Sequence, residues 1–142
     1  MKERFTTEEW EHLRRLPFAI FVVVAGADEA ITPDELRRFE DRLNEAATCV
    51  DPLERELLLG LLDADVDALL EDVMGALVEE LETAKRILAA RLSREEYHRF
   101  LGSLFTLTLA ADESDATKRA AAALVNMLEV DMDAGIASLA RL

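Results

Sequence analysis

The sequence predicts an all-α protein, and three observations support this prediction. Apolar residues recur with helical spacing along the chain, and no stretch alternates as a half-buried strand would. Only five glycines and three prolines interrupt the 142 residues. With 51% hydrophobic residues, the chain has enough apolar side chains for one core. We therefore expect residues 1–142 to form a single compact domain of about seven helices.

Capping sequences mark where several of these helices begin. Thr7 precedes two glutamates, and Thr32-Pro33-Asp34-Glu35 combines an N-cap threonine, a proline at the first helical position and a carboxylate three residues after the cap. Asp51-Pro52-Leu53-Glu54 repeats this pattern, and Ser93-Arg94-Glu95-Glu96 has it without the proline. Pro17 is expected to kink the first helix or to start a second one. Together with the periodicity, these signals place helices near residues 8–27, 33–47, 52–62, 66–90, 94–111, 116–129 and 133–141.

A weak internal repeat relates two halves of the chain at an offset of 84 residues. The first helix of each half ends alike, in Ala27-Asp28-Glu29 and in Ala111-Asp112-Glu113. The domain is therefore expected to consist of two weakly related halves. The matching positions are Leu13, Leu16, Ile20, Phe21 and Val24 with Tyr97, Phe100, Leu104, Phe105 and Thr108, and then Leu36, Phe39 and Leu43 with Ala120, Ala123 and Met127.

The charge balance and the cysteine count exclude several functional classes. Thirty acidic residues against sixteen basic ones give a net charge of −14, which argues against a nucleic-acid binder. The single cysteine, Cys49, excludes an internal disulfide and a cysteine-rich metal site, and we interpret it as a small buried apolar residue. No serine lies in a nucleophile motif and no glycine-rich phosphate loop is present, so neither an enzyme nor a small-molecule substrate is evident.

The apolar run from Leu16 to Ala27 bears on cellular location. Its twelve residues are too few to span a membrane, which takes about 20. A signal peptide is the alternative, since Ala25 and Ala27 resemble a cleavage site, but glutamates among the preceding basic residues argue against it. We interpret the run as a buried core helix of a cytoplasmic protein.

One group of acidic residues lies at the ends of expected helices. Asp28 and Asp112 fall at helix C-termini, where the helix dipole disfavours an anion. Asp34 and Glu35 open the next helix of the first half, and Asp115 lies near the corresponding start in the second half. Carboxylates placed in this way call for a counter-charge, which an arginine, water or a hard divalent cation such as calcium or magnesium would supply. Solvated loop residues are the alternative interpretation.

The stretch from Ala25 to Glu35, AGADEAITPDE, resembles the signature loop of the tellurite-resistance TerB-like helical family. Asp28 and the run Ile31-Thr32-Pro33-Asp34-Glu35 match that pattern, whereas Glu29 replaces the usual glycine. In the second half, Lys118 and Arg119 stand where the family pattern has acids. The resemblance implies a small helical domain of two related halves, an acidic cluster proposed to bind metal, and a role in stress response or in membrane-associated complexes.

Two other metal-site patterns have simpler explanations. Glu9-x-x-His12 and Glu95-x-x-His98 have the spacing of a di-iron bundle site, but both lie in first helical turns away from the apolar stripes, so we expect surface histidines. Asp63-x-Asp65-x-Asp67 begins like a calcium-binding EF-hand loop. That loop needs glycine and glutamate where Ala68 and Met74 stand, so capping by Asp65 explains it instead.

The span from Glu56 to Ala84 contains nine acidic residues and neither lysine nor arginine. Its apolar residues follow helical spacing, so the acids form an opposite face, either solvated or a docking surface for a basic partner. The sequence as a whole favours a non-enzymatic binding module with an acidic, cation-binding site at Asp28, Asp34, Glu35, Asp112 and Asp115. The alternative is a metal-free interaction domain that binds a protein partner or itself. The apolar residues of the acidic span are Val66, Leu69, Leu70, Val73, Leu77, Val78 and Leu81.

Overall fold

The computed structural model describes residues 1–26, 31–109 and 115–142, and these residues form helices and no strand. The all-α prediction is therefore confirmed. In chain order the elements are the short 3₁₀-helix η1 (Lys2–Arg4), α1 (Thr7–Ala25), α2 (Pro33–Asn44), the 3₁₀-helix η3 (Ala46–Thr48), α3 (Pro52–Leu59), α4 (Val66–Gly75), α5 (Leu77–Arg91), α6 (Arg94–Leu109), α7 (Asp115–Met127) and α8 (Met132–Ala140).

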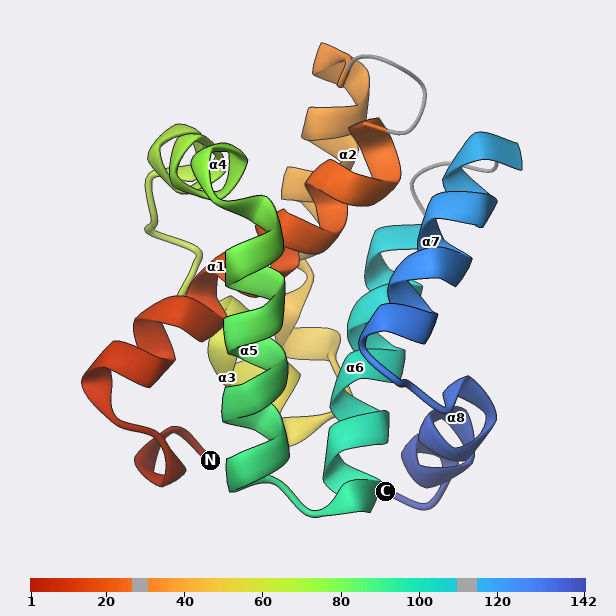
Figure 1. The fold of residues 1–142 in the computed structure, drawn as a ribbon. Helices are drawn as coiled ribbons and strands as arrows, with labels where there is room; N and C mark the ends of the chain where they lie inside the picture. Colours follow the sequence, from red (N-terminus) through yellow and green to blue (C-terminus); the bar gives the residue numbers. More distant parts are fainter. Residues whose placement is uncertain (27–30, 110–114) are drawn as a thin grey trace.

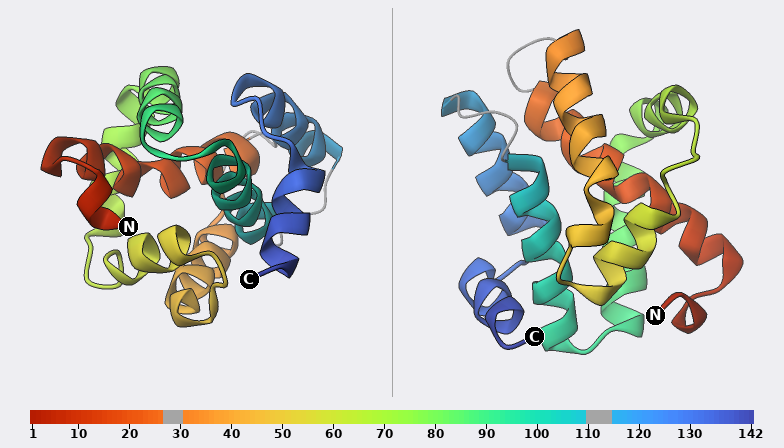
Figure 2. Two further views of the ribbon diagram at one scale, coloured as in Figure 1. Left: turned by 90° about the horizontal axis from the view of Figure 1, so that it is seen from below. Right: turned by 180° about the vertical axis from the view of Figure 1, so that it is seen from behind.

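Helices α1 and α6 lie in the middle of the molecule (Figures 1 and 2). The left panel of Figure 2 shows α4 and α5 on one side of them and α2 and α3 on the opposite side. Helices α7 and α8 lie beside α6, and α8 packs along α6. Because α1 contacts α3, α4, α5, α6 and α7, it organises the packing of both halves of the chain.

The second half of α1 is buried all round its circumference. Residues 16–21 are six consecutive buried residues, which is the pattern of a helix enclosed by protein. Phe39 of α2 stacks on Phe21, with the ring centroids 4.3 Å apart. Ile20, Phe21, Leu104 and Phe105, which match one another in the repeat, are each at most 1% exposed and belong to one cluster. The buried core helix predicted from the sequence is therefore confirmed. No helix in the described ranges has the length and apolar character needed to cross a membrane.

Most of the predicted helix starts are correct. Thr32, Asp51, Asp65 and Ser93 each accept a hydrogen bond from the backbone N–H three residues later. The first helix begins earlier than predicted, because Thr6 and not Thr7 caps it and Glu9 completes the capping box. Pro17 starts no second helix, since α1 continues through it to Ala25.

The prediction of one helix over residues 66–90 is wrong. Ala76 has φ −151° and ψ 45°, and its N–H bonds to Val73, which separates α4 from α5. Both pieces pack against α1 but run in different directions (Figure 1), so tertiary packing overrides the local periodicity. Gly75 is a weak helix former and favours the break at this point.

The predicted register of α7 is also wrong. Ala123, matched with Phe39 in the repeat, is exposed, and the buried residues of α7 are Thr117, Ala121 and Leu124. The small side chains of an alanine-rich helix do not identify its buried face. The sequence match between the halves therefore does not extend to which residues of α2 and α7 are buried. The other predicted boundaries differ by a few residues, as where α2 ends at Asn44 and α3 at Leu59.

The core position of Phe105 leads to a first prediction. Phe105→Ala empties a fully buried aromatic site and should lower the free energy of unfolding by ~3–5 kcal/mol. Urea denaturation monitored by circular dichroism measures this change. A loss under ~1 kcal/mol would contradict the position of Phe105 in the core.

A second prediction concerns the close approach of α8 to α6. A Cβ atom added at Gly135 would lie 2.4 Å from the backbone oxygen of His98, whereas one added at Gly75 would meet nothing within 4 Å. Gly135→Ala should therefore cost ~1–3 kcal/mol or more, because backbone atoms must move apart. Gly75→Ala is the matched control and should leave stability unchanged or raise it slightly. Equal melting temperatures for the two variants would show that α8 does not pack this tightly.

Candidate functional site

Two of the predicted acidic residues lie in the first turn of α2. Thr32 Oγ1 accepts from the backbone N–H of Glu35 at 3.1 Å, and Glu35 Oε1 lies 3.1 Å from Thr32 Oγ1. The other carboxylate oxygen of Glu35, Oε2, is buried and has no hydrogen-bond partner among the described residues. Asp34 is exposed and lies 3.6 Å from Arg37, and an exposed pair of this kind contributes little to stability. The capping roles predicted for this turn are therefore confirmed, and Glu35 Oε2 lacks a partner within the part of the chain that the structure describes.

The start of α7 lies against the end of α1. Thr117 Oγ1 donates to the backbone oxygen of Val24 at 3.3 Å. Asp115, the first residue of α7, is exposed and makes no ion pair with any described residue. The structure thus places the start of α7, where Asp115 lies, next to the described end of α1.

Asp28 and Asp112 lie outside the described residues. The structure therefore gives no distance from either aspartate to Glu35 or Asp115. Within residues 1–26, 31–109 and 115–142, no three His, Cys, Asp or Glu side chains form a group that could hold a metal ion. The cation site therefore stays a prediction that depends on the two undescribed aspartates.

The residues of the two Glu-x-x-His patterns make other contacts. Glu9 completes the cap of α1 and pairs with Arg91, and His12 Nδ1 lies 3.1 Å from Glu80 Oε2. Glu95 pairs with Arg141, whereas His98 Nδ1 accepts from the backbone N–H of Asp131. The prediction of a surface position is wrong for His98, which is 9% exposed because α8 packs over this part of α6.

A buried polar cluster between α3 and α6 escaped the sequence analysis. Asp51 caps α3 and also lies 2.9 Å from Arg99 Nε, and Ser103 donates to Glu54 Oε1 at 2.6 Å. Asp51 is 1% and Glu54 2% exposed. The sequence predicts a capping role for Glu54, but its carboxyl group faces Ser103 of α6 instead. Its spacing from Leu53, Leu57 and Leu58 places it on the apolar face of α3, and this signal could have revealed its burial.

Burial controls the proton affinity of this cluster. Desolvation raises the pKa of the Glu54 carboxyl above its ordinary value of 4.5, and the nearby Asp51 carboxylate adds to the rise. Desolvation, reinforced by the Glu54 carboxylate, also raises the pKa of the Cys49 thiol to about 12. The Cys49 thiol therefore stays protonated at neutral pH, and a thiol is a poor nucleophile compared with a thiolate.

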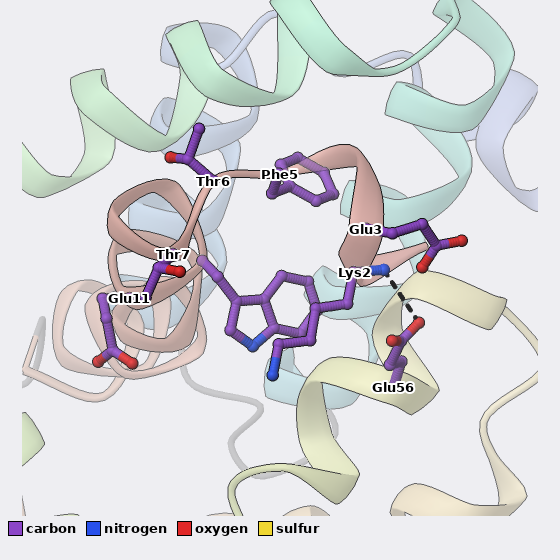
Figure 3. Close-up of a pocket in the computed structure, with 8 residues that line it drawn as sticks. Lys2, Glu3, Phe5, Thr6, Thr7, Glu11 and Glu56 are labelled. Atoms are coloured by element: carbon purple, nitrogen blue, oxygen red, sulfur yellow. Dashed lines mark hydrogen bonds between the residues drawn. The ribbon is translucent and has the colours of Figure 1, made fainter.

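The hollow at the N-terminal end of the molecule, of about 460 Å³, is lined by η1, the first turns of α1 and Glu56 of α3 (Figure 3). The backbone N–H of Lys2 donates to Glu56 Oε2 at 3.2 Å, as the dashed line in Figure 3 marks. The Lys2 ammonium lies 5.7 Å from the centre of the Trp10 ring, in cation–π contact. The chain's own cation therefore already occupies the aromatic face of this hollow.

Comparison with protein-family models, with curated proteins and with solved structures finds no match for this chain.

Burial of Glu54 leads to a third prediction. Because its pKa is raised in the folded state, the proton on Glu54 stabilises the fold fully below the ordinary value of 4.5, and this stabilisation is lost as pH rises through the raised pKa. When the pH is raised from 4 to 7, the free energy of unfolding of wild type should therefore fall relative to that of Glu54→Gln. The expected relative fall is about 1 kcal/mol or more. Urea denaturation at both pH values measures the difference.

The control for this experiment is Glu71→Gln, which removes an exposed carboxylate from α4. Its stability relative to wild type should change little between the two pH values. If Glu54→Gln behaves in the same way, Glu54 ionises normally in the folded protein and is not buried as described.

Proposed function

We propose that this protein is a non-enzymatic binding module whose acidic end binds a hard divalent cation, calcium or magnesium. The site comprises Asp28, Asp34, Glu35, Asp112 and Asp115. The resemblance of residues 25–35 to the TerB-like signature loop supports this proposal, and it extends the proposal to a role in tellurite-type stress response in the cytoplasm.

The observation that carries the proposal is the buried Oε2 atom of Glu35. A buried polar atom without a partner costs ~1–3 kcal/mol, so such atoms in folded proteins usually face water or an ion. Calcium and magnesium both prefer oxygen ligands, carboxylates among them. Glu35 Oε1 is engaged in the cap, and no described residue occupies Oε2.

The neighbouring contacts agree with a shared site at this end of the molecule. The bond from Thr117 to Val24 holds the start of α7 against the end of α1. This places Asp115, which has no ionic partner among the described residues, within two residues of that contact. At a net charge of −14, a cation at such a site would also relieve repulsion between carboxylates.

A second candidate is the metal-free interaction domain, which the surface around the α4–α5 junction favours. Met74 is 66% and Val78 59% exposed, so Val78 does not belong to the buried stripe that the sequence predicts. Seven of the nine acidic residues between Glu56 and Ala84 are exposed, and the two half-buried ones are Glu56 and Glu80. Exposed apolar side chains surrounded by carboxylates fit a partner with an apolar face and a basic rim.

Cation binding leads to the fourth prediction. At a free calcium or magnesium concentration 100 times the dissociation constant, the folded state should gain about 2.7 kcal/mol. In a domain of this size the melting temperature should rise by several degrees. Asp28→Asn and Glu35→Gln should both remove this rise, and glutamine keeps the capping interaction of Glu35 while removing its charge. Differential scanning calorimetry measures the shift.

Asp72→Asn serves as the control, because it removes one exposed carboxylate from α4 on another part of the molecule. Every titration is matched in ionic strength with sodium chloride, since general screening also stabilises a strongly acidic chain. Equal shifts for wild type, Asp28→Asn and Asp72→Asn would contradict a specific cation site. The interaction domain would then be the better explanation.

A further inference from the structure

A groove of about 510 Å³ lies between α5, the first turns of α6 and the connection from α7 to α8. Leu92 and Tyr97, together with Ala89, give it apolar walls, and Lys85, Arg94 and His98 bring nitrogen donors to it. Glu129 is the one acidic residue among those that line it. In a chain with a net charge of −14, a groove with two permanent cations and one carboxylate is unusual.

His98 presents a defined donor to this groove. Its Nδ1 accepts a hydrogen bond of 3.0 Å from the backbone N–H of Asp131, so the neutral ring carries its proton on Nε2. The residue is nine-tenths buried, and Nε2 has no partner among the described residues. Nε2 is not among the fully buried described atoms that lack a partner, and His98 is one of the residues that line the groove.

The two cations of the groove differ in availability. Lys85 Nζ donates to the backbone oxygen of Met127 at 3.1 Å and lies 3.2 Å from Glu129 Oε2, so the single carboxylate of the groove is already paired. Arg94 is exposed and makes no ion pair or hydrogen bond through its side chain with any described residue. The guanidinium of Arg94 and the Nε2–H of His98 therefore remain for an incoming anion.

The connection from α7 to α8, which forms one wall of the groove, contains a strained turn. Glu129 has φ 55°, in the left-handed region, at the position after α7 where glycine is usual. The N–H of Val130 bonds to Val125 and that of Glu129 to Asn126, which completes the helix-ending motif. The Tyr97 hydroxyl donates to the backbone oxygen of Leu128. These bonds fix the wall before any ligand arrives, and a preformed wall favours binding.

We propose that this groove binds a small organic carboxylate, its acid group held by Arg94 and His98 and its apolar body lying against Leu92 and Tyr97. An arginine and a neutral imidazole N–H both donate to carboxylate oxygens, and the apolar walls favour an organic anion over an inorganic one. This site is separate from the acidic end of the molecule and does not depend on the function proposed for it.

Benzoate is the probe, because it joins a carboxylate to an apolar ring, and inorganic phosphate is titrated in a parallel arm. Two-dimensional NMR of the ¹⁵N-labelled full chain at constant ionic strength should show saturable shifts for Leu92–Arg99, for Glu129–Asp131 and for His98 Nε2. Arg94→Gln should weaken benzoate binding about five- to tenfold, as expected for loss of one charge-assisted contact. Because the Arg94 side chain makes no hydrogen bond or ion pair with a described residue, this variant should fold normally.

Arg119→Gln is the matched control, since it removes an exposed arginine with no described partner from α7 and should bind benzoate as wild type does. Three outcomes would overturn the proposal. In the first, benzoate shifts the NMR signals of the groove residues no more than chloride does. In the second, Arg94→Gln and Arg119→Gln change the affinity for benzoate equally. In the third, phosphate binds as tightly as benzoate.

Discussion

The enclosure of α1 is the constraint on which the rest of the structure depends. Six consecutive residues, 16–21, are buried, so this helix needs neighbours on all sides, and helices α2 to α7 supply them. A helix that is apolar all round would be insoluble alone, and burying it provides much of the hydrophobic free energy of the fold. The same run resembles the apolar part of a signal peptide, and here it forms part of the folded core.

Close packing around two central helices determines where polar groups can be buried. Glu54 and Asp51 lie where α3 meets α6, and each is bonded to a side chain of α6, namely Ser103 and Arg99. An unpaired carboxylate at this depth would cost several kcal/mol, so these bonds fix the orientation of α3 on α6. Most of the remaining carboxylates lie at the surface, which keeps the protein strongly anionic outside and apolar inside.

Most features encoded within four residues were predictable from the sequence, and features that depend on distant contacts were not. The caps at Thr32 and Ser93 involve only neighbouring residues, and they were found correctly. The break at Ala76 and the burial of His98 depend on packing against α1 and α8, which local periodicity does not contain. For the acidic end, the sequence placed Asp34 and Glu35 in the right turn, but the buried Oε2 of Glu35 became visible only in three dimensions.

The contact of Gly135 with the backbone of His98 has a consequence for the order in which the molecule is assembled. At Gly135, helix α8 lies against α6 with no room for a side chain, and Asp131 of the same segment supplies the N–H that sets the tautomer of His98. Both contacts join α6 to residues more than thirty positions later in the chain. During synthesis from the N-terminus, α6 therefore leaves the ribosome well before its partner, and the groove beside it takes its final form only when α8 has docked.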